Sequence, residues 1–160
     1  MSSPAETPEH RSWTMSRVRS KDTAPEMVVR RLVHAMGYRF RLHGGKLPGK
    51  PDLVFPGRRK VIFVHGCFWH RHDDPSCKLS RTPKSNLDYW RPKFERNRER
   101  DAVNLERLTE LGWEALVIWE CQTRDREALT RLIHNFLGTN ARTASSPGPW
   151  RTRQPASATP

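Results

Sequence analysis

The chain has 160 residues, and its 29 Lys and Arg residues outnumber 17 Asp and Glu residues, which gives a formal net charge of +12. This length suits one domain with a modest core, and the charge indicates a polyanionic partner, most simply nucleic acid. The polar N-terminal sequence is unlike a signal peptide, and no apolar stretch approaches the roughly 20 residues that span a bilayer. We therefore expect a cytoplasmic protein that has no membrane partner and keeps its three cysteines reduced.

The first predicted element is a helix. Thr23 is its expected cap, Glu26 stands at the capping-box position, and Gly37 indicates its end. Six further elements follow in the order strand, strand, strand, helix, strand, helix: 38–42, 52–55, 60–65, about 93–111, 113–119 and 125–137. The long helix should turn four apolar residues inward: Phe94, Leu105, Leu108 and Leu111. This alternation predicts an α/β fold.

The ends of the chain differ in composition from its middle. Residues 1–14 are polar and contain proline, which predicts a flexible N-terminal arm. Residues 139–160 carry Ser, Thr, Pro and Arg with little apolar content, which predicts a disordered basic tail. The folded domain is expected to span residues 15–138.

The predicted hairpin places an acid near a histidine. If its turn centres on residues 57–58, Asp52 faces Phe63, and His65 lies two positions further on the same face. Diagonal neighbours of this kind are roughly 7–8 Å apart, a gap that a metal ion or a water could bridge. Asp52 is therefore a candidate Mg²⁺ ligand, together with the backbone carbonyl of Val64. The alternative is that Asp52 is an ordinary turn residue after a proline.

A cluster of histidines follows the third predicted strand. Side chains at strand ends are held by the sheet yet open to solvent, which favours a chemical role. His65 or His70 could act as general base or proton donor, because imidazole titrates near neutral pH. A Mg²⁺ ion would polarise a phosphate and lower the pKa of an attacking water. Glu26 is either only a capping partner or a further acid of this site.

Four residues could form a metal site of a different kind. Cys67, His72 and Cys77 have the spacing Cys-x4-His-x4-Cys, and Cys121 follows the last predicted strand. A Cys₃His set is typical of structural zinc, and this set uses every cysteine of the chain. The alternative is three free thiols and surface histidines, and spacing alone does not decide whether His70 or His72 is the ligand.

Two aromatic residues lie inside the same polar loop. Phe68 and Trp69, like Met15 near the N-terminus, could be wedges that enter between base steps of DNA. The local pattern slightly favours the alternative, in which Phe68 and Trp69 pack beneath the metal-binding loop.

The chain resembles the very short patch repair (Vsr) endonucleases of bacterial mismatch repair over residues 15–124. The matching stretches are Met15, Asp22–Glu26, Leu47–Asp52, Val61–His72 and Leu111–Cys121. The resemblance implies a restriction-endonuclease-like core, in which helices flank a central mixed sheet, with a structural zinc site. It also implies a Mg²⁺-dependent nick of one strand, just 5′ of the thymine in a T:G mismatch. Such mismatches arise when 5-methylcytosine deaminates, and the nick starts very short patch repair.

The resemblance also implies roles for particular residues. Asp52 matches the metal-binding aspartate. Val64 stands where another member can carry threonine, and valine serves equally well if the Mg²⁺ ligand is the backbone carbonyl. The residues that match the catalytic histidines and a further active-site acid are His65, His70 and Glu26. The residues that match the zinc ligands are Cys67, His72, Cys77 and Cys121, although the loop before Cys77 is longer here. The residues that match the intercalating side chains are Met15, Phe68 and Trp69, which reverses the slight preference for packing.

We accordingly expect a monomer that acts on double-stranded DNA with a T:G mismatch in the bacterial nucleoid, with mismatch-repair proteins as candidate partners. Two alternatives stay open. One is a nuclease of the same fold from a defence or mobile-element system with different recognition. The other is a zinc-stabilised DNA-binding module without activity, against which the joint presence of Asp52, His65 and His70 argues.

Overall fold

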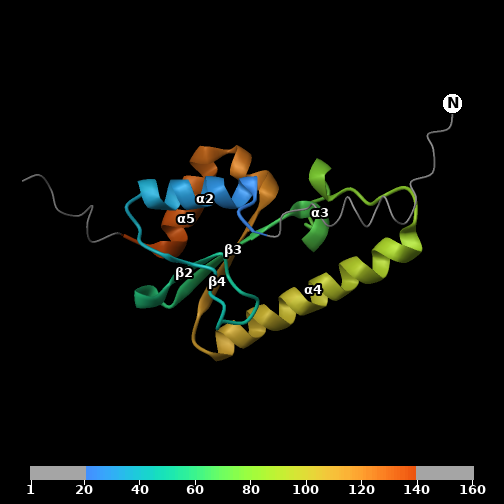
Figure 1. Ribbon diagram of the computed structural model, residues 1–160. Helices are drawn as coiled ribbons and strands as arrows, with labels where there is room; N and C mark the ends of the chain where they lie inside the picture. Colours follow the sequence, from blue (N-terminus) through green and yellow to red (C-terminus); the bar gives the residue numbers. More distant parts are fainter. Residues whose placement is uncertain (1–20, 140–160) are drawn as a thin grey trace, which may run out of the picture.

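The computed structural model describes residues 21–139, which form a four-stranded sheet with helices on both faces (Figure 1). Met15, the predicted N-terminal arm and all but the first residue of the predicted tail lie outside this range. The α/β class and the flanked mixed sheet are confirmed. No helix within the described range is long and apolar enough to cross a membrane.

The sheet has the order β1-β2-β3-β4. Its strands are β1 (Arg41–Leu42), β2 (Leu53–Phe55), β3 (Lys60–His65) and β4 (Glu114–Trp119). The first three pair antiparallel, and β4 pairs parallel with β3 along its whole length. Although β4 is apolar in sequence, only Ile118 is buried in it, because β4 is an edge strand of this sheet.

The predicted strand over 38–42 shortens to the two residues of β1. The N–H of Tyr38 donates to the carbonyl of Val33 at 3.2 Å, so it continues the end of the preceding helix instead of a strand ladder. The tyrosine hydroxyl donates to the carbonyl of Gly138. Tyr38 therefore packs in the hydrophobic core between two helices and is not part of the sheet.

The hairpin register is confirmed. Leu53 pairs with Ile62, and Val54 pairs with Val61, as a turn centred on residues 57–58 requires. The turn is a short 3₁₀ helix, η1 (Pro56–Arg58). The N–H of Asp52 donates to the Ile62 carbonyl at 3.1 Å, so the pairing extends one residue beyond β2 and fixes Asp52 beside β3.

Helix α2 (Ala24–Ala35) begins and ends where its sequence predicts. Thr23 is the N-cap, and its hydroxyl accepts the N–H of Glu26 at 3.4 Å. Gly37 follows the C-cap with a φ of 85°, a conformation that glycine adopts without strain. Helix α5 (Arg126–Leu137) is also confirmed, with Asp125 as its N-cap.

Helix α4 (Leu87–Glu110) starts six residues before its predicted beginning, with Pro92 inside it. The extra turns carry Trp90, which is buried together with Phe94 against the short helix α3 (Cys67–His70). Packing of Trp90 and Phe94 on α3 therefore accompanies the longer helix, which continues through Pro92. The predicted inward position of Leu111 is wrong, since this residue is 52% exposed beyond the end of the helix.

Two layers of apolar packing hold the helices on the sheet. Helices α2 and α5 cover one face through a cluster of Val29, Leu32, Val33, Leu53, Phe55, Ile62, Ile118, Leu129, Ile133 and Leu137 (Figure 1). Helix α4 contributes Leu108 to a smaller cluster on the other face with Val54, Val61 and Phe63. Because the second cluster is small, the end of β3 stays open beside α4.

Three consecutive basic residues at the β2–β3 turn bind the carboxyl ends of two helices. Arg58 and Lys60 donate to carbonyls in the last turn of α5 at 2.8 and 2.6 Å. Arg59 donates to the C-cap carbonyl of α4 at 2.7 Å. Positive groups at helix C-termini complement the helix dipole, so these charges stabilise the fold.

Candidate active site and metal cluster

A cleft of about 880 Å³ opens where β3 ends beside α4. Its lining brings together four of the residues predicted for the active site: Asp52, Val64, His65 and His70. Three exposed basic residues also line it, Lys21, Lys50 and Arg100. The cleft therefore combines an acid and two imidazoles with a positive rim that suits an anionic ligand.

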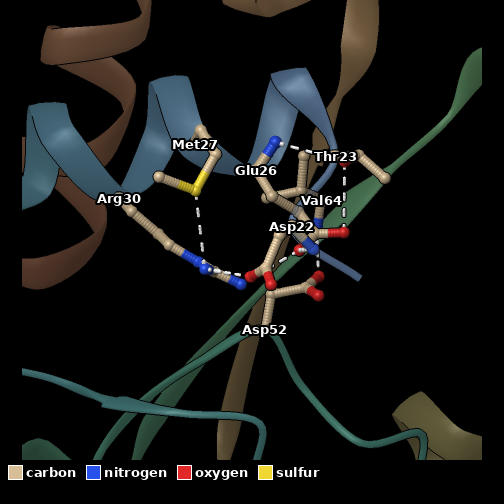
Figure 2. Close-up of polar contacts among 7 residues, drawn as sticks. All are labelled: Asp22, Thr23, Glu26, Met27, Arg30, Asp52 and Val64. Atoms are coloured by element: carbon tan, nitrogen blue, oxygen red, sulfur yellow. Dashed lines mark hydrogen bonds and ion pairs between the residues drawn. The ribbon is translucent and has the colours of Figure 1, made fainter. Parts of the chain in front are cut away.

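Asp52 is held at the floor of this cleft by β3. Its Oδ2 accepts the N–H of Val64 at 2.7 Å (Figure 2). Burial raises the pKa of Asp52 to about 6 against the pull of this hydrogen bond, and the charge of Glu26 adds to the rise. Among the described residues only Oδ2 is hydrogen-bonded, so Oδ1 can accept a cation. A half-buried carboxylate in this situation gains from a nearby divalent ion, and Asp52 fits a Mg²⁺ ligand.

Glu26 is buried at the start of α2, with 4% of its surface exposed. Its Oε1 accepts the hydroxyl of Thr23 at 3.1 Å, and its Oε2 accepts the N–H of Asp22 at 3.0 Å (Figure 2). The predicted capping box is thus shifted by one residue, because Asp22 and not Thr23 offers its backbone N–H. Since its charge acts on Asp52, Glu26 belongs to the same electrostatic site.

His65 and His70 stack face to face, with ring centroids 3.9 Å apart and planes 13° from parallel. Burial, with an added contribution from the neighbouring His70, lowers the pKa of His65 to about 4. His65 is therefore neutral at physiological pH. Two imidazoles in such contact cannot both be charged without strong repulsion, so the stacked pair carries at most one positive charge.

Asp101 of α4 completes this group, and the sequence analysis did not identify it. Its Oδ2 pairs with Nδ1 of His70 at 2.5 Å. Burial alone would raise the pKa of Asp101, but the hydrogen bond and charge of His70 hold it below the usual range. Asp101 and Asn97 fall at helical spacing between Phe94 and Leu105, which interrupts an otherwise apolar stripe. These two polar residues in an apolar stripe were the sequence feature from which Asp101 could have been identified.

The predicted Cys₃His set comes together in space. The ligand atoms of Cys67, His72, Cys77 and Cys121 all lie within 4.8 Å of one another. Nδ1 of His72 is 3.4 Å from the sulfur of Cys121, whereas His70 faces Asp101 instead. Burial raises the pKa of Cys67 to about 12, so a thiolate there requires a nearby cation. The four residues fit a tetrahedral zinc site, in which ligand atoms stand close together and thiolates bind the ion.

This cluster ties two distant parts of the chain. Cys67 opens α3, and Cys121 lies in the 3₁₀ helix η3 (Glu120–Arg124) after β4. The backbone N–H of Cys121 also donates to the sulfur of Cys67 at 3.4 Å. The segment after β3 is thereby fastened to the end of the neighbouring strand, which fixes His70 over the cleft.

Phe68 and Trp69 lie on α3 and contact aromatic residues of α4. The Phe68 ring meets those of Trp90 and Phe94 edge to face, at 5.4 and 5.2 Å between centroids. The ammonium of Lys93 lies 5.5 Å from the centre of the Trp69 ring. These contacts match the packing alternative, while both side chains remain only half-buried. Met15, the third residue expected to intercalate, lies outside the described residues.

The cleft and its residues are typical of metal-dependent nucleases, in which carboxylates and imidazoles act on a phosphodiester. Comparison with known proteins narrows this class. A family model described as DNA mismatch endonuclease Vsr matches residues 4–77. Because relatives that include the Escherichia coli member also match most of its length, the chain belongs to the Vsr family of DNA mismatch endonucleases.

Individual relatives extend the match beyond residue 77. The type II nicking enzyme V.XorIIP of Xanthomonas oryzae is 52% identical over 131 residues, which cover 82% of this chain and 94% of the relative. The type II nicking enzyme V.NmeAIP of Neisseria meningitidis is 40% identical over 134 residues, covering 81% and 94%. The DNA mismatch endonuclease Vsr of Escherichia coli is 43% identical over 120 residues, covering 75% of each chain.

Proposed function

We propose that this protein is a strand-specific endonuclease that nicks DNA 5′ of the thymine in a T:G mismatch produced by deamination of 5-methylcytosine. The nick would start very short patch repair. The observation that carries the proposal is the cleft that joins Asp52 to the group of His65, His70 and Asp101. Membership of the Vsr family supports it. The proposal includes a restriction-endonuclease-like core over residues 15–138 that acts as a monomer on chromosomal DNA.

In this proposal Asp52 and the carbonyl of Val64 would hold Mg²⁺, which would polarise the scissile phosphate and lower the pKa of the attacking water. Lys50 and Arg100 at the rim bind the phosphates on either side. Glu26, whose charge acts on the Asp52 carboxylate, is proposed as a further acid of this site.

His70 is the proposed general base. The Asp101 carboxylate accepts the Nδ1 proton of His70, which leaves the lone pair on Nε2 to receive a proton from water. His65 stays neutral beneath it and steadies the ring by stacking. A neutral His65 can donate a hydrogen bond to a phosphate oxygen without adding a charge that would repel a protonated His70.

The Cys₃His cluster is proposed to bind one structural Zn²⁺. A filled tetrahedral site has no open position for substrate, so the ion would support the fold and take no part in the reaction. Its role would be to hold α3, and with it His70, in place.

Phe68, Trp69 and Met15 are proposed to enter the DNA beside the mismatch. A mispaired base is already weakly held, so inserting a side chain costs less there than in matched DNA. Phe68 and Trp69 would act from the edge of the aromatic cluster, whose packing presents their exposed surfaces together.

The names of two relatives favour a second candidate, a type II nicking enzyme with different recognition. A nicking assay on labelled duplexes that carry T:G, C:G or T:A at one position, with and without Mg²⁺, separates the two. The mismatch proposal requires Mg²⁺-dependent nicking of T:G alone. Equal nicking of all three duplexes would reject mismatch recognition, and nicking without divalent ions would reject the Mg²⁺ assignment.

A further inference from the structure

Arg30 is a buried cation that pairs with two acids and whose charge also acts on Asp52. Arg30 lies one turn after Glu26 on α2, with 9% of its surface exposed. Its guanidinium donates to Oε2 of Glu26 at 3.1 Å and to Oδ1 of Asp22 (Figure 2). Its Nε is buried and has no hydrogen-bond partner among residues 21–139. The side chain therefore adds a positive charge at a place where simple stability would not require one.

Arg30 completes the set of groups that hold the Glu26 carboxylate. One oxygen of Glu26 accepts the Thr23 hydroxyl, and the other accepts both the Asp22 N–H and the guanidinium. Two of these three donors belong to the fixed start of α2. The carboxylate cannot turn toward Asp52 without losing hydrogen bonds in a buried environment, which is costly.

The position of Glu26 matters for an ion held by Asp52. Mg²⁺ is usually bound by one or two carboxylates and keeps several positions for water and substrate phosphate. A second carboxylate that moved onto the ion would occupy a position that the reaction needs. It would also bind the ion more tightly, because opposite charges attract strongly in a partly buried site.

We propose, on the basis of the function proposed above, that Arg30 is a positioning residue that keeps Glu26 off the metal ion and so leaves its coordination sphere open for the DNA phosphate. Arg30 thus lowers the affinity of the site for the metal ion and raises the rate of nicking. Its removal should therefore strengthen ion binding and slow nicking at the same time. Loss of a residue with a purely structural role would not have these opposite effects, since partial unfolding lowers both ion affinity and nicking rate.

The test compares Arg30→Met, Arg30→Lys and Arg31→Met in the full-length protein. Arg31 is the matched control, because it is the next residue of α2 and is exposed. Ion binding is measured without DNA, by the loss of the electron paramagnetic resonance signal of free Mn²⁺. Nicking of a T:G duplex is measured at saturating Mg²⁺, and duplex affinity is measured in Ca²⁺.

Arg30→Met should bind Mn²⁺ roughly 3- to 10-fold more tightly, because a nearby positive charge is lost. It should nick at least about 10-fold more slowly, with duplex affinity unchanged. Arg30→Lys keeps the charge but offers Glu26 fewer donors, so its Mn²⁺ affinity and its nicking rate should both lie between those of wild type and Arg30→Met. Arg31→Met should match wild type in all three measurements.

Equal or weaker Mn²⁺ binding by folded Arg30→Met overturns the proposal. If Arg30→Met unfolds, Arg30→Lys carries the test, and wild-type nicking by that variant overturns it. The Asp52→Asn variant should lose Mn²⁺ binding, which places the measured ion in the cleft. Tighter Mn²⁺ binding by Arg30→Met in a protein that never nicks T:G duplexes would reject the proposed function but support the control of the metal by Arg30.

Discussion

Two candidate ion sites within residues 21–139 share one short stretch of sequence but are built on opposite principles. His65 and His70 line the Asp52 cleft, whereas Cys67 and His72 belong to the cysteine cluster. The cysteine cluster is closed, since four neutral or thiolate ligands surround one point and leave no position free. The Asp52 cleft is open, rimmed by basic side chains, and holds a carboxylate whose charge burial disfavours. One site should contribute stability without chemistry, and the other should contribute chemistry at a cost in stability.

The largest expected effect is on the open site. Asp52→Asn keeps an acceptor for the N–H of Val64 but removes the charge that binds the ion. Nicking of a T:G duplex should fall by about 10³-fold or more, because metal-assisted activation of water is lost. In Mg²⁺-free buffer at neutral pH the variant should melt no lower than wild type, since a disfavoured charge has been removed. Substantial nicking by Asp52→Asn would contradict the metal assignment.

Cys121→Ser tests the closed site, where the expected effect is a loss of stability and not a direct loss of chemistry. Loss of one zinc ligand should cost several kcal/mol, or roughly 10 °C or more in melting temperature for a domain of this size. Metal analysis of the wild type should find about one zinc per chain, as a Cys₃His site requires. A well-folded wild type without zinc would show that the cluster is only a group of thiols.

Asp101→Asn should leave the fold in place and reduce nicking roughly 10²-fold, within the range typical of general base catalysis. The amide can offer its NH₂ group to Nδ1 of His70, which would favour the tautomer with its proton on Nε2 and remove the base. Glu106→Gln, on the same helix but outside the cleft, is the control and should nick normally. If both variants behave alike, the pairing of Asp101 with His70 has no catalytic role.

The pH dependence of stability should reveal two opposing titrations in the Mg²⁺-free protein. The folded pKa of His65, about 4, lies below its ordinary value of 6.5, so its contribution to stability is lost as pH falls from 6.5 to 4. The folded pKa of Asp52, about 6, lies above its ordinary value of 3.8, so its contribution to stability is lost as pH rises from 3.8 to 6. Between pH 4 and pH 6 the two groups should change the free energy of unfolding by nearly equal amounts in opposite directions.

Single substitutions should expose each titration separately in chemical denaturation between pH 4 and 6. Without Asp52, the free energy of unfolding should fall as pH falls, with a slope of up to about 1.4 kcal/mol per pH unit. A His65→Asn variant should show a slope of opposite sign. Slopes of the same sign in both variants would show that the two groups are not buried as described.

The smallest expected effects concern α3. Phe68→Ala and Trp69→Ala should lower the ratio of T:G to T:A nicking, by roughly 10-fold if each side chain contributes about 1.4 kcal/mol to unstacking at the mismatch. Because both rings also pack on α4, the melting temperature is measured beside the ratio. A variant that melts much lower but keeps its ratio would assign these residues to packing alone.

The parts of the fold that were predictable have local causes. The start of α2 follows from Thr23, and the register of the hairpin follows from its turn, so the juxtaposition of Asp52 and β3 could be predicted from adjacent residues. The Cys₃His set was predictable because few residue types bind zinc, although only the structure assigns His72 to it.

The parts that were missed depend on contacts between distant segments. Asp101 looks like one more charge on a solvated helix until α4 is placed over His70. Arg30 looks like half of an exposed Arg pair in the sequence, yet only 9% of its surface is exposed once α2 is packed in the fold. The early start of α4 depends on Trp90 finding Phe68, a contact that no local pattern encodes.

The basic turn between β2 and β3 changes how the charge of +12 should be read. Arg58, Arg59 and Lys60 are engaged with helix carbonyls, so their guanidinium and ammonium groups are not free to displace counterions from DNA. The logarithm of the DNA association constant falls with the logarithm of salt concentration by about 0.9 for each phosphate neutralised. The salt dependence of binding should therefore report a contact footprint smaller than the net charge suggests, set by the basic groups around the cleft.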